Sequence, residues 1–180
     1  MKPNEHPIIF SAKSVRAILA GQKTQTRRVV KLRATDGKCS RNCSGIDLSL
    51  AWPDRGIGGG GYLKIPCRDG ATQRVDCPYG GVGDRLWVKE AWRNRSPIFM
   101  PRKFSRLTLS IVAVRCEQLR EITMADARAE GARPGTKYET FRSAYQRQWD
   151  AINSRRGFDW DSNPLVWVIE FRRANNVNQS

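Results

Sequence analysis

Alternation of hydrophobic and polar positions predicts β-strands in the second half of the chain. Between Arg106 and Cys116 the residues fall into two sets, with Leu107, Leu109, Ile111 and Ala113 on one face and Thr108, Ser110, Val112 and Val114 on the other. Such spacing is typical of a strand in a small barrel, where one face packs inward. Apolar runs predict two further strands, over residues 86–92 and 165–172.

Three other segments carry apolar residues at helical spacing. The first follows a predicted N-cap at Ser11 and ends at Gly21, where a left-handed residue would stop the helix. The second starts with Thr123 and Asp126, which match a capping box, and ends at Gly131. The third spans 137–153, and its apolar stripe, which we expect in the core, is Tyr138, Phe141, Tyr145, Trp149 and Ile152. Strands mixed with helices predict an α+β domain in which helices flank a small barrel.

A glycine-rich insertion at about 35–76 interrupts this pattern. The run from Gly58 to Gly61 cannot hold a regular element without help, so we predict irregular chain there. A G-x-G-x-x-G match beginning at Gly56 lacks the preceding strand and the following helix that a dinucleotide site requires. We therefore assign it no cofactor and expect a solvated loop, with a flap over a cleft as the alternative.

Four of the five cysteines fall in or beside this insertion. Cys39, Cys43, Cys67 and Cys77 supply enough thiolates for one tetrahedral structural zinc ion. Their spacing contains no C-x-x-C pair and matches no common zinc finger, so free thiols in a loop remain an equal alternative. An odd cysteine count without an export signal argues against a disulfide framework, and Cys116, which ends a predicted strand, fits a small core residue.

The net charge of the chain indicates what kind of partner it binds. With 32 Lys and Arg against 17 Asp and Glu, the chain carries a formal charge of +15, which favours nucleic acid over an acidic protein or a membrane.

A length of 180 residues fits one domain spanning 1–180, and 39% hydrophobic residues suffice for a core. No apolar stretch of roughly 18 residues appears. The apolar N-terminal run from Pro7 to Phe10 is too short for a signal peptide, so we expect a cytoplasmic protein.

The segment richest in reactive groups is 21–28, directly after the first predicted helix. It brings together an amine, hydroxyls and guanidiniums in Lys23, Thr26, Arg27 and Arg28, and such groups bind or attack an anionic substrate. The single histidine, His6, lies near the terminus, which argues against a histidine-centred triad or a histidine-ligated catalytic metal. Another group must therefore carry the proton.

Four segments together resemble the ASCH domain family, which is similar to PUA domains. They are residues 21–28, 83–90, 122–131 and 166–171, with the sequences GQKTQTRR, GDRLWVKE, ITMADARAEG and VWVIEF. The resemblance covers the chain from about Pro7 to Arg173 outside the insertion, and we expect phage or prophage ASCH proteins as its nearest relatives. It implies a small PUA-like β-barrel with flanking helices, whose cleft handles RNA or a modified nucleoside.

One branch of that family, the N4-acetylcytidine amidohydrolases, uses a lysine, a threonine three residues later and a glutamate from a downstream helix. Lys23, Thr26 and Glu130 occupy the matching positions, so the resemblance implies that they are catalytic. A free lysine, with a pKa of ~10.4, is protonated, but burial and nearby cations can lower that pKa. Lys23 would then take a proton from Thr26 or from water, and Glu130 would hold the amine and pass the proton to the departing nitrogen.

Other ASCH proteins are proposed to be ribonucleases or RNA binders without catalysis, so those functions, and that of a phage accessory protein, stay open beside the amidohydrolase. The candidate contacts to nucleic acid or substrate are Arg27, Arg28, Glu90, Arg102, Lys103 and Arg106. The last three interleave with Phe99 and Phe104, which suits phosphate contact and stacking on an unpaired base, or else a solvated loop between strands. Glu90 either faces the cleft or pairs with an arginine.

Overall fold

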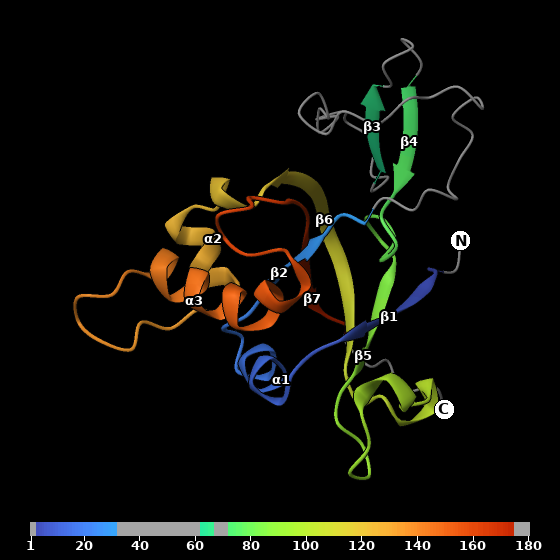
Figure 1. The fold of residues 1–180 in the computed structure, drawn as a ribbon. Helices are drawn as coiled ribbons and strands as arrows, with labels where there is room; N and C mark the ends of the chain where they lie inside the picture. Colours follow the sequence, from blue (N-terminus) through green and yellow to red (C-terminus); the bar gives the residue numbers. More distant parts are fainter. Residues whose placement is uncertain (1–2, 32–61, 67–71, 175–180) are drawn as a thin grey trace.

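The structure is a computed structural model, and it describes residues 3–31, 62–66 and 72–174 (Figure 1). In chain order its strands and helices are β1 (Glu5–Ile9), α1 (Ala12–Leu19), β2 (Gln25–Val29), β3 (Tyr62–Pro66), β4 (Thr72–Asp76), β5 (Arg85–Lys89), β6 (Thr108–Gln118), α2 (Met124–Ala129), α3 (Phe141–Asn153) and β7 (Leu165–Arg173). Short 3-10 turns at Pro97–Phe99, Arg102–Phe104, Leu119–Glu121 and Ser154–Arg156 lie in the connections. This mixture of elements agrees with the predicted α+β class.

Five strands form one sheet in the order β1-β5-β6-β7-β2, and β3 pairs with β4 in a separate hairpin. β1 runs parallel to β5, whereas the other neighbours in the large sheet are antiparallel. Within residues 3–31, 62–66 and 72–174, the edge strands β1 and β2 do not pair with each other. The described part of the chain therefore holds an open sheet, and closure of the predicted barrel is not observed.

β7 is buried on both faces, as its unbroken apolar run would require. On one face, Trp167 and Ile169 join a core with α1 and with the inner side chains of the β3–β4 hairpin. On the other face, Val166 and Val168 pack with residues of α2 and α3. The sheet is thus a middle layer between α1 on one side and α2 with α3 on the other.

A β-bulge lies in β6, where the register with β7 shifts between Ile111 and Ala113. Before the bulge, Ile111 points into the core, and after it Cys116 does, with Val114 packed against the same cluster. The alternation predicted over 106–116 is therefore confirmed as far as Ile111 and wrong for Ala113 and Val114. The extra residue in the bulge reverses which side chains face inward.

The caps predicted for the first two helices are present. The Ser11 side chain accepts a hydrogen bond from the Ser14 amide at the start of α1, and Gly21 has a φ of +70° just past its end. At α2, Thr123 and Asp126 form the expected capping box. Each of these signals acts over a few residues, so the sequence alone reveals it.

α3 begins later than predicted. Thr140 is its N-cap, so the helix starts at Phe141 and the predicted first turn from residue 137 is not helical. Tyr138 is 83% exposed and Ile152 is 66% exposed, which leaves Tyr145 and Trp149 as the buried members of the predicted stripe. In the described part of the chain, no helix is long and apolar enough to cross a membrane.

Two regions contain strands that were not predicted. β1 takes up residues near the N-terminus and includes His6, whose imidazole lies 3.8 Å from the Asp84 carboxylate. β3 and β4 fall inside the insertion predicted to be irregular, and that prediction is wrong for them because the facing residues Leu63 and Val75 bury their side chains in the core. Conversely, the strand predicted over 86–92 ends at Lys89.

Candidate active site

The C-terminal ends of α1 and α2 meet beside the start of β2. The Thr24 amide donates a 2.9 Å hydrogen bond to the carbonyl of the last α2 residue, which ties the chain before β2 to that helix. Gly21 follows α1 and Gly131 follows α2, with φ of +70° and +77°, so each helix ends in a sharp left-handed turn. These turns bring Lys23 next to Glu130, the C-cap residue of α2.

Lys23 and Glu130 form a buried ion pair. Lys23 Nζ lies 2.7 Å from Glu130 Oε2 and donates a second 2.7 Å hydrogen bond to the Glu130 backbone carbonyl. The two side chains are 6% and 4% exposed. Burial lowers the pKa of Lys23 below its ordinary value of 10.5, because the attraction of Glu130 does not make up for the lost hydration. Lys23 is thus held in place and gives up its proton more readily than an exposed lysine.

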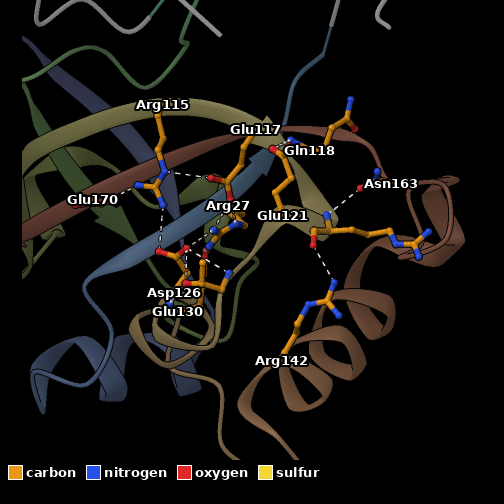
Figure 2. Close-up of polar contacts among 12 residues, drawn as sticks. Arg27, Arg115, Glu117, Gln118, Glu121, Asp126, Glu130, Arg142, Asn163 and Glu170 are labelled. Carbon is orange, nitrogen blue, oxygen red and sulfur yellow. Dashed lines mark hydrogen bonds and ion pairs between the residues drawn. The ribbon is translucent and has the colours of Figure 1, made fainter. Parts of the chain in front are cut away.

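Arg27 lies at the centre of the same cluster, and its side chain is fully buried. The guanidinium lies 3.3 Å from Glu130 Oε1 and 3.4 Å from Asp126 Oδ2, and its Nε donates a 3.0 Å hydrogen bond to Glu117 Oε1. Burial opposes the charge, but Glu130 and Glu117 outweigh it and raise the pKa of Arg27. Figure 2 shows these carboxylates around Arg27, with Arg115 bridging Glu117 and Asp126. Arg27, predicted to contact substrate, directs its guanidinium at carboxylates of the protein itself.

A cleft of about 1550 Å³ opens over this cluster. Lys23, Thr26 and Glu130 all line it, so the three residues predicted to be catalytic share one cavity. The Thr26 side chain is largely buried, and within residues 3–31, 62–66 and 72–174 its hydroxyl has no hydrogen-bond partner. The geometry therefore leaves a hydroxyl for a bound molecule, while the catalytic role of the three residues stays a prediction.

Arg28 and Tyr145 complete the polar wall of the cleft. The Arg28 guanidinium lies 5.2 Å from the centre of the Phe10 ring and donates a 2.6 Å hydrogen bond to the Ile9 carbonyl. Burial raises the pKa of Tyr145 well above its ordinary value, so its hydroxyl stays neutral. The sequence marked Tyr145 only as a core residue of a helical stripe, and the spacing of that stripe carries no signal for a cleft.

The cleft is strongly cationic. Among residues 3–31, 62–66 and 72–174, nine lysines and arginines line it, against the two acids Asp76 and Glu130. The nine are Lys13, Arg16, Lys23, Arg27, Arg28, Lys31, Lys89, Arg133 and Arg156. Because Glu130 is already engaged by Lys23 and Arg27, the cleft keeps a positive field that attracts anionic ligands.

The other predicted contacts lie elsewhere. Glu90 pairs with Arg106 at 2.7 Å, which decides between the two alternatives for that acid in favour of pairing. Arg102 pairs with Glu5 at 2.8 Å. The described lining of the cleft does not include Glu90, Arg102, Lys103 or Arg106. The structure therefore does not bring these predicted contacts together with Lys23.

The zinc prediction concerns mostly residues outside the described part of the chain, where Cys39, Cys43 and Cys67 lie. Cys77 is buried, and in the free protein burial raises the pKa of its thiol to about 11. Among the described residues, no group of three or more His, Cys, Asp or Glu side chains is placed to hold a metal ion. Cys116 is buried, as predicted for a small core residue.

Glu117 and Asp126 are site residues that sequence analysis missed. Asp126 carries a clear local signal, but that signal is for helix capping, which it also performs. Glu117 lies 90 positions from Arg27, and only the pairing of β6 with β7 and of β7 with β2 brings them close. A contact of that range has no signature in a single sequence.

No protein-family model matches this sequence, and a search of curated proteins gives no match. Two solved structures are similar over most of the chain. An ASCH domain from Lactobacillus crispatus JV V101 gives a TM-score of 0.47 at 12% identity, covering 94% of this chain and 79% of that one. A DUF984 protein from Enterococcus faecalis V583 gives a TM-score of 0.46 at 10% identity, over 97% of this chain and 77% of that one. Likeness at this level establishes neither membership of a family nor a function.

Proposed function

We propose that this protein is an ASCH-type, PUA-like domain that removes an N4-acyl group from cytidine, as a modified nucleoside or within RNA. The observation that carries the proposal is the Lys23–Glu130 ion pair, buried at 2.7 Å in the wall of a cationic cleft. Burying two charges costs hydration that their attraction barely repays, so such a pair contributes little to stability. A chemical role accounts for its presence better than a structural one.

The reaction needs a base, a nucleophile and a proton donor. Neutral Lys23 takes a proton from water or from the Thr26 hydroxyl, and the oxygen then forms a bond to the acyl carbon. Glu130, in contact with Lys23 Nζ, passes the proton to the amide nitrogen as the C–N bond breaks. The products are cytidine and the free acid, and where Thr26 is the nucleophile a water molecule releases the acid from it in a second step.

Arg27 stabilises the charge of Glu130 in the state in which Lys23 is neutral. An arginine stays charged at all relevant pH values, and Arg27 binds the second carboxylate oxygen of Glu130. Glu130 therefore keeps a cationic partner after Lys23 has lost its proton. In this scheme Arg27 is a positioning residue, and substrate contact falls to the half-buried Arg28 and to the exposed cations of the cleft.

The test is product analysis with N4-acetylcytidine and with a short labelled RNA, for the wild-type chain and for Lys23→Met. We expect release of cytidine by the wild type and a loss of roughly 10²- to 10⁴-fold in the variant, the size of a general-base contribution. Lys137→Met, which changes an exposed lysine far along the sequence, is the matched control and should retain the wild-type rate. Wild-type rates in Lys23→Met would remove the amidohydrolase proposal.

A second candidate function, RNA binding without hydrolysis of the base, is favoured by the nine cations of the cleft. In that case neither substrate changes, and binding of RNA falls steeply as salt rises. Cleavage of the RNA that disappears in Lys23→Met would instead assign the site to a ribonuclease. The same assay therefore distinguishes RNA binding without turnover and RNA cleavage from the release of cytidine that we expect.

A further inference from the structure

The connection between β5 and β6 forms a basic and aromatic surface. Residues 91–106 contain five lysines and arginines and no acid. In Figure 1 this connection extends from the end of the sheet opposite the β3–β4 hairpin. We call its outward-facing residues the basic–aromatic surface, which consists of Trp92, Arg93, Arg95, Phe99, Lys103 and Phe104.

Two of its rings are already stacked on each other. Trp92 and Phe104 lie with ring centres 4.6 Å apart and planes inclined by 29°. The Arg93 guanidinium lies 4.7 Å from the Trp92 ring, and Lys103 Nζ lies 5.2 Å from the Phe104 ring. Phe99 is 68% exposed and has no ring or cation contact within the described residues. The surface thus offers one free aromatic face beside a preformed stack that carries cations.

The charges of the connection fall into two groups with different tasks. Arg102 pairs with Glu5 of β1 and so fastens the connection to the sheet, whereas Arg106 pairs with Glu90 and so joins the two ends of the connection. Arg93, Arg95 and Lys103 have no carboxylate partner within residues 3–31, 62–66 and 72–174. The anchored connection therefore presents uncompensated positive charge on its outer side.

The connection that carries the basic–aromatic surface borders the cleft at Ile98. Lys89, at the end of β5, and Ile98, within the connection, both line the cleft, and the Lys89 ammonium donates to the Ile98 carbonyl. Met100 is buried and accepts a hydrogen bond from the Glu90 amide through its sulfur, which fixes the connection close to β5. A strand stacked on Phe99 would therefore lie next to a residue that lines the cleft, Ile98.

We infer that this surface binds an unpaired RNA strand whose acylated cytidine enters the cleft, so that a polynucleotide is a better substrate than the free nucleoside. This inference rests on the proposed function. A base stacks on Phe99, and the phosphates on either side contact Arg93, Arg95 and Lys103. A duplex offers no unstacked base to Phe99. Arg93, Arg95 and Lys103 lie on both sides of Phe99 in the sequence, and residues 91–106 contain no acid, so the charge of the surface favours a polyanion over a protein partner.

The test is a titration of a fluorescein-labelled oligouridine of twelve nucleotides, single-stranded or annealed to oligoadenosine, at several salt concentrations. Phe99→Ala should weaken binding of the single strand roughly tenfold, the effect of losing one stacked base. The double variant Arg93→Gln with Lys103→Gln should lower the slope of log K against log salt by about 0.7 for each phosphate that the variant no longer binds. Tyr138→Ala is the matched control, since Tyr138 is also exposed with a lysine 4.9 Å from its ring.

Equal affinity of Phe99→Ala and wild type, or an unchanged salt slope in the double variant, would overturn the inference. A preference for the duplex would overturn it too. A dimer of the wild type that dissociates in Phe99→Ala would assign the surface to a second copy of the chain instead. Two measurements separate this inference from the proposed function. Turnover of N4-acetylcytidine without oligouridine binding leaves the proposed function and removes this inference. Oligouridine binding that depends on Phe99, with no turnover of N4-acetylcytidine either free or within RNA, removes the proposed hydrolysis and leaves only a surface that binds RNA.

Discussion

Two ion pairs of the same length behave differently in this protein. Lys23–Glu130 and Arg106–Glu90 each have 2.7 Å between nitrogen and oxygen. The first pair is 6% and 4% exposed, whereas Arg106 is 65% exposed. In the buried pair, loss of hydration is the largest effect and lowers the pKa of the lysine, while in the exposed pair the hydrogen bond from Arg106 is the largest effect and lowers the pKa of Glu90. The burial of a pair, more than its length, decides what it does.

The largest expected effect separates the two pairs directly. Glu130→Gln leaves Lys23 and Arg27 buried without their shared counter-charge and should lower the free energy of unfolding by about 3–5 kcal/mol. Glu90→Gln removes the acid of a pair that is open to water and should cost no more than about 1 kcal/mol, less at high salt. Urea unfolding of both variants gives the comparison. Similar losses in the two would show that burial does not distinguish them.

A smaller effect tests how closely the backbone is fitted around Lys23. A methyl group at Gly131 would lie 3.2 Å from Lys23 Cβ, whereas at Gly157, which has nearly the same φ, it would meet nothing within 4 Å. Both Gly131→Ala and Gly157→Ala should cost about 1–2 kcal/mol in unfolding free energy for the left-handed conformation. We expect Gly131→Ala alone to lower kcat for N4-acetylcytidine as well, because it displaces the lysine. Equal kcat values in the two variants would contradict this.

The smallest expected effect comes from a change of pH that protonates or deprotonates Lys23. Because the pKa of folded Lys23 lies below 10.5, the unfolded chain binds an extra proton at pH values between the two. Stability should therefore rise with pH through that window, by at most about 1.4 kcal/mol per pH unit, and the cost of the buried charge is fully present below it. kcat/KM should rise as the pH approaches the pKa of folded Lys23, where the amine becomes a base, and should level off above it.

Unfolding midpoints of the wild type and Lys23→Met, measured from pH 7 to 10.5, isolate this contribution, since all other titrating groups are shared. A difference between the two proteins that does not vary with pH would show that the pKa of Lys23 is not lowered.

How far the fold was predictable depends on the range of the interaction. The caps at Ser11 and Thr123 involve neighbours within a few residues, and both were found. β1 was missed because Glu5–Ile9 contains a proline and gains its strand conformation from β5, about 80 positions away. The start of α3 was misplaced because an apolar stripe shows which face is buried and not where the helix begins, which Thr140 decides.

The same limit applies to the candidate site. Lys23 and Glu130 are 107 positions apart, and they were placed together only through the resemblance to ASCH proteins. Arg27 was taken for a substrate contact because it stands in a run of cations, and its burial depends on carboxylates of β6 and α2. The cationic cleft itself follows from tertiary packing, although the net charge of the chain already indicated an anionic partner.

The bulge in β6 adds one residue to the strand, and this changes which face every later side chain of the strand points to. Upstream of it the odd-numbered residues Leu109 and Ile111 join the core that includes α1. Downstream, Cys116 joins that core, while Glu117 binds Arg27 and Arg115 binds Glu117. Val112, at the point of insertion, is exposed, so substitutions there should be nearly silent, whereas its deletion would shift every downstream side chain to the opposite face. The cluster of carboxylates around Arg27 thus depends on the number of residues in β6. An insertion or a deletion changes that number, whereas a substitution does not.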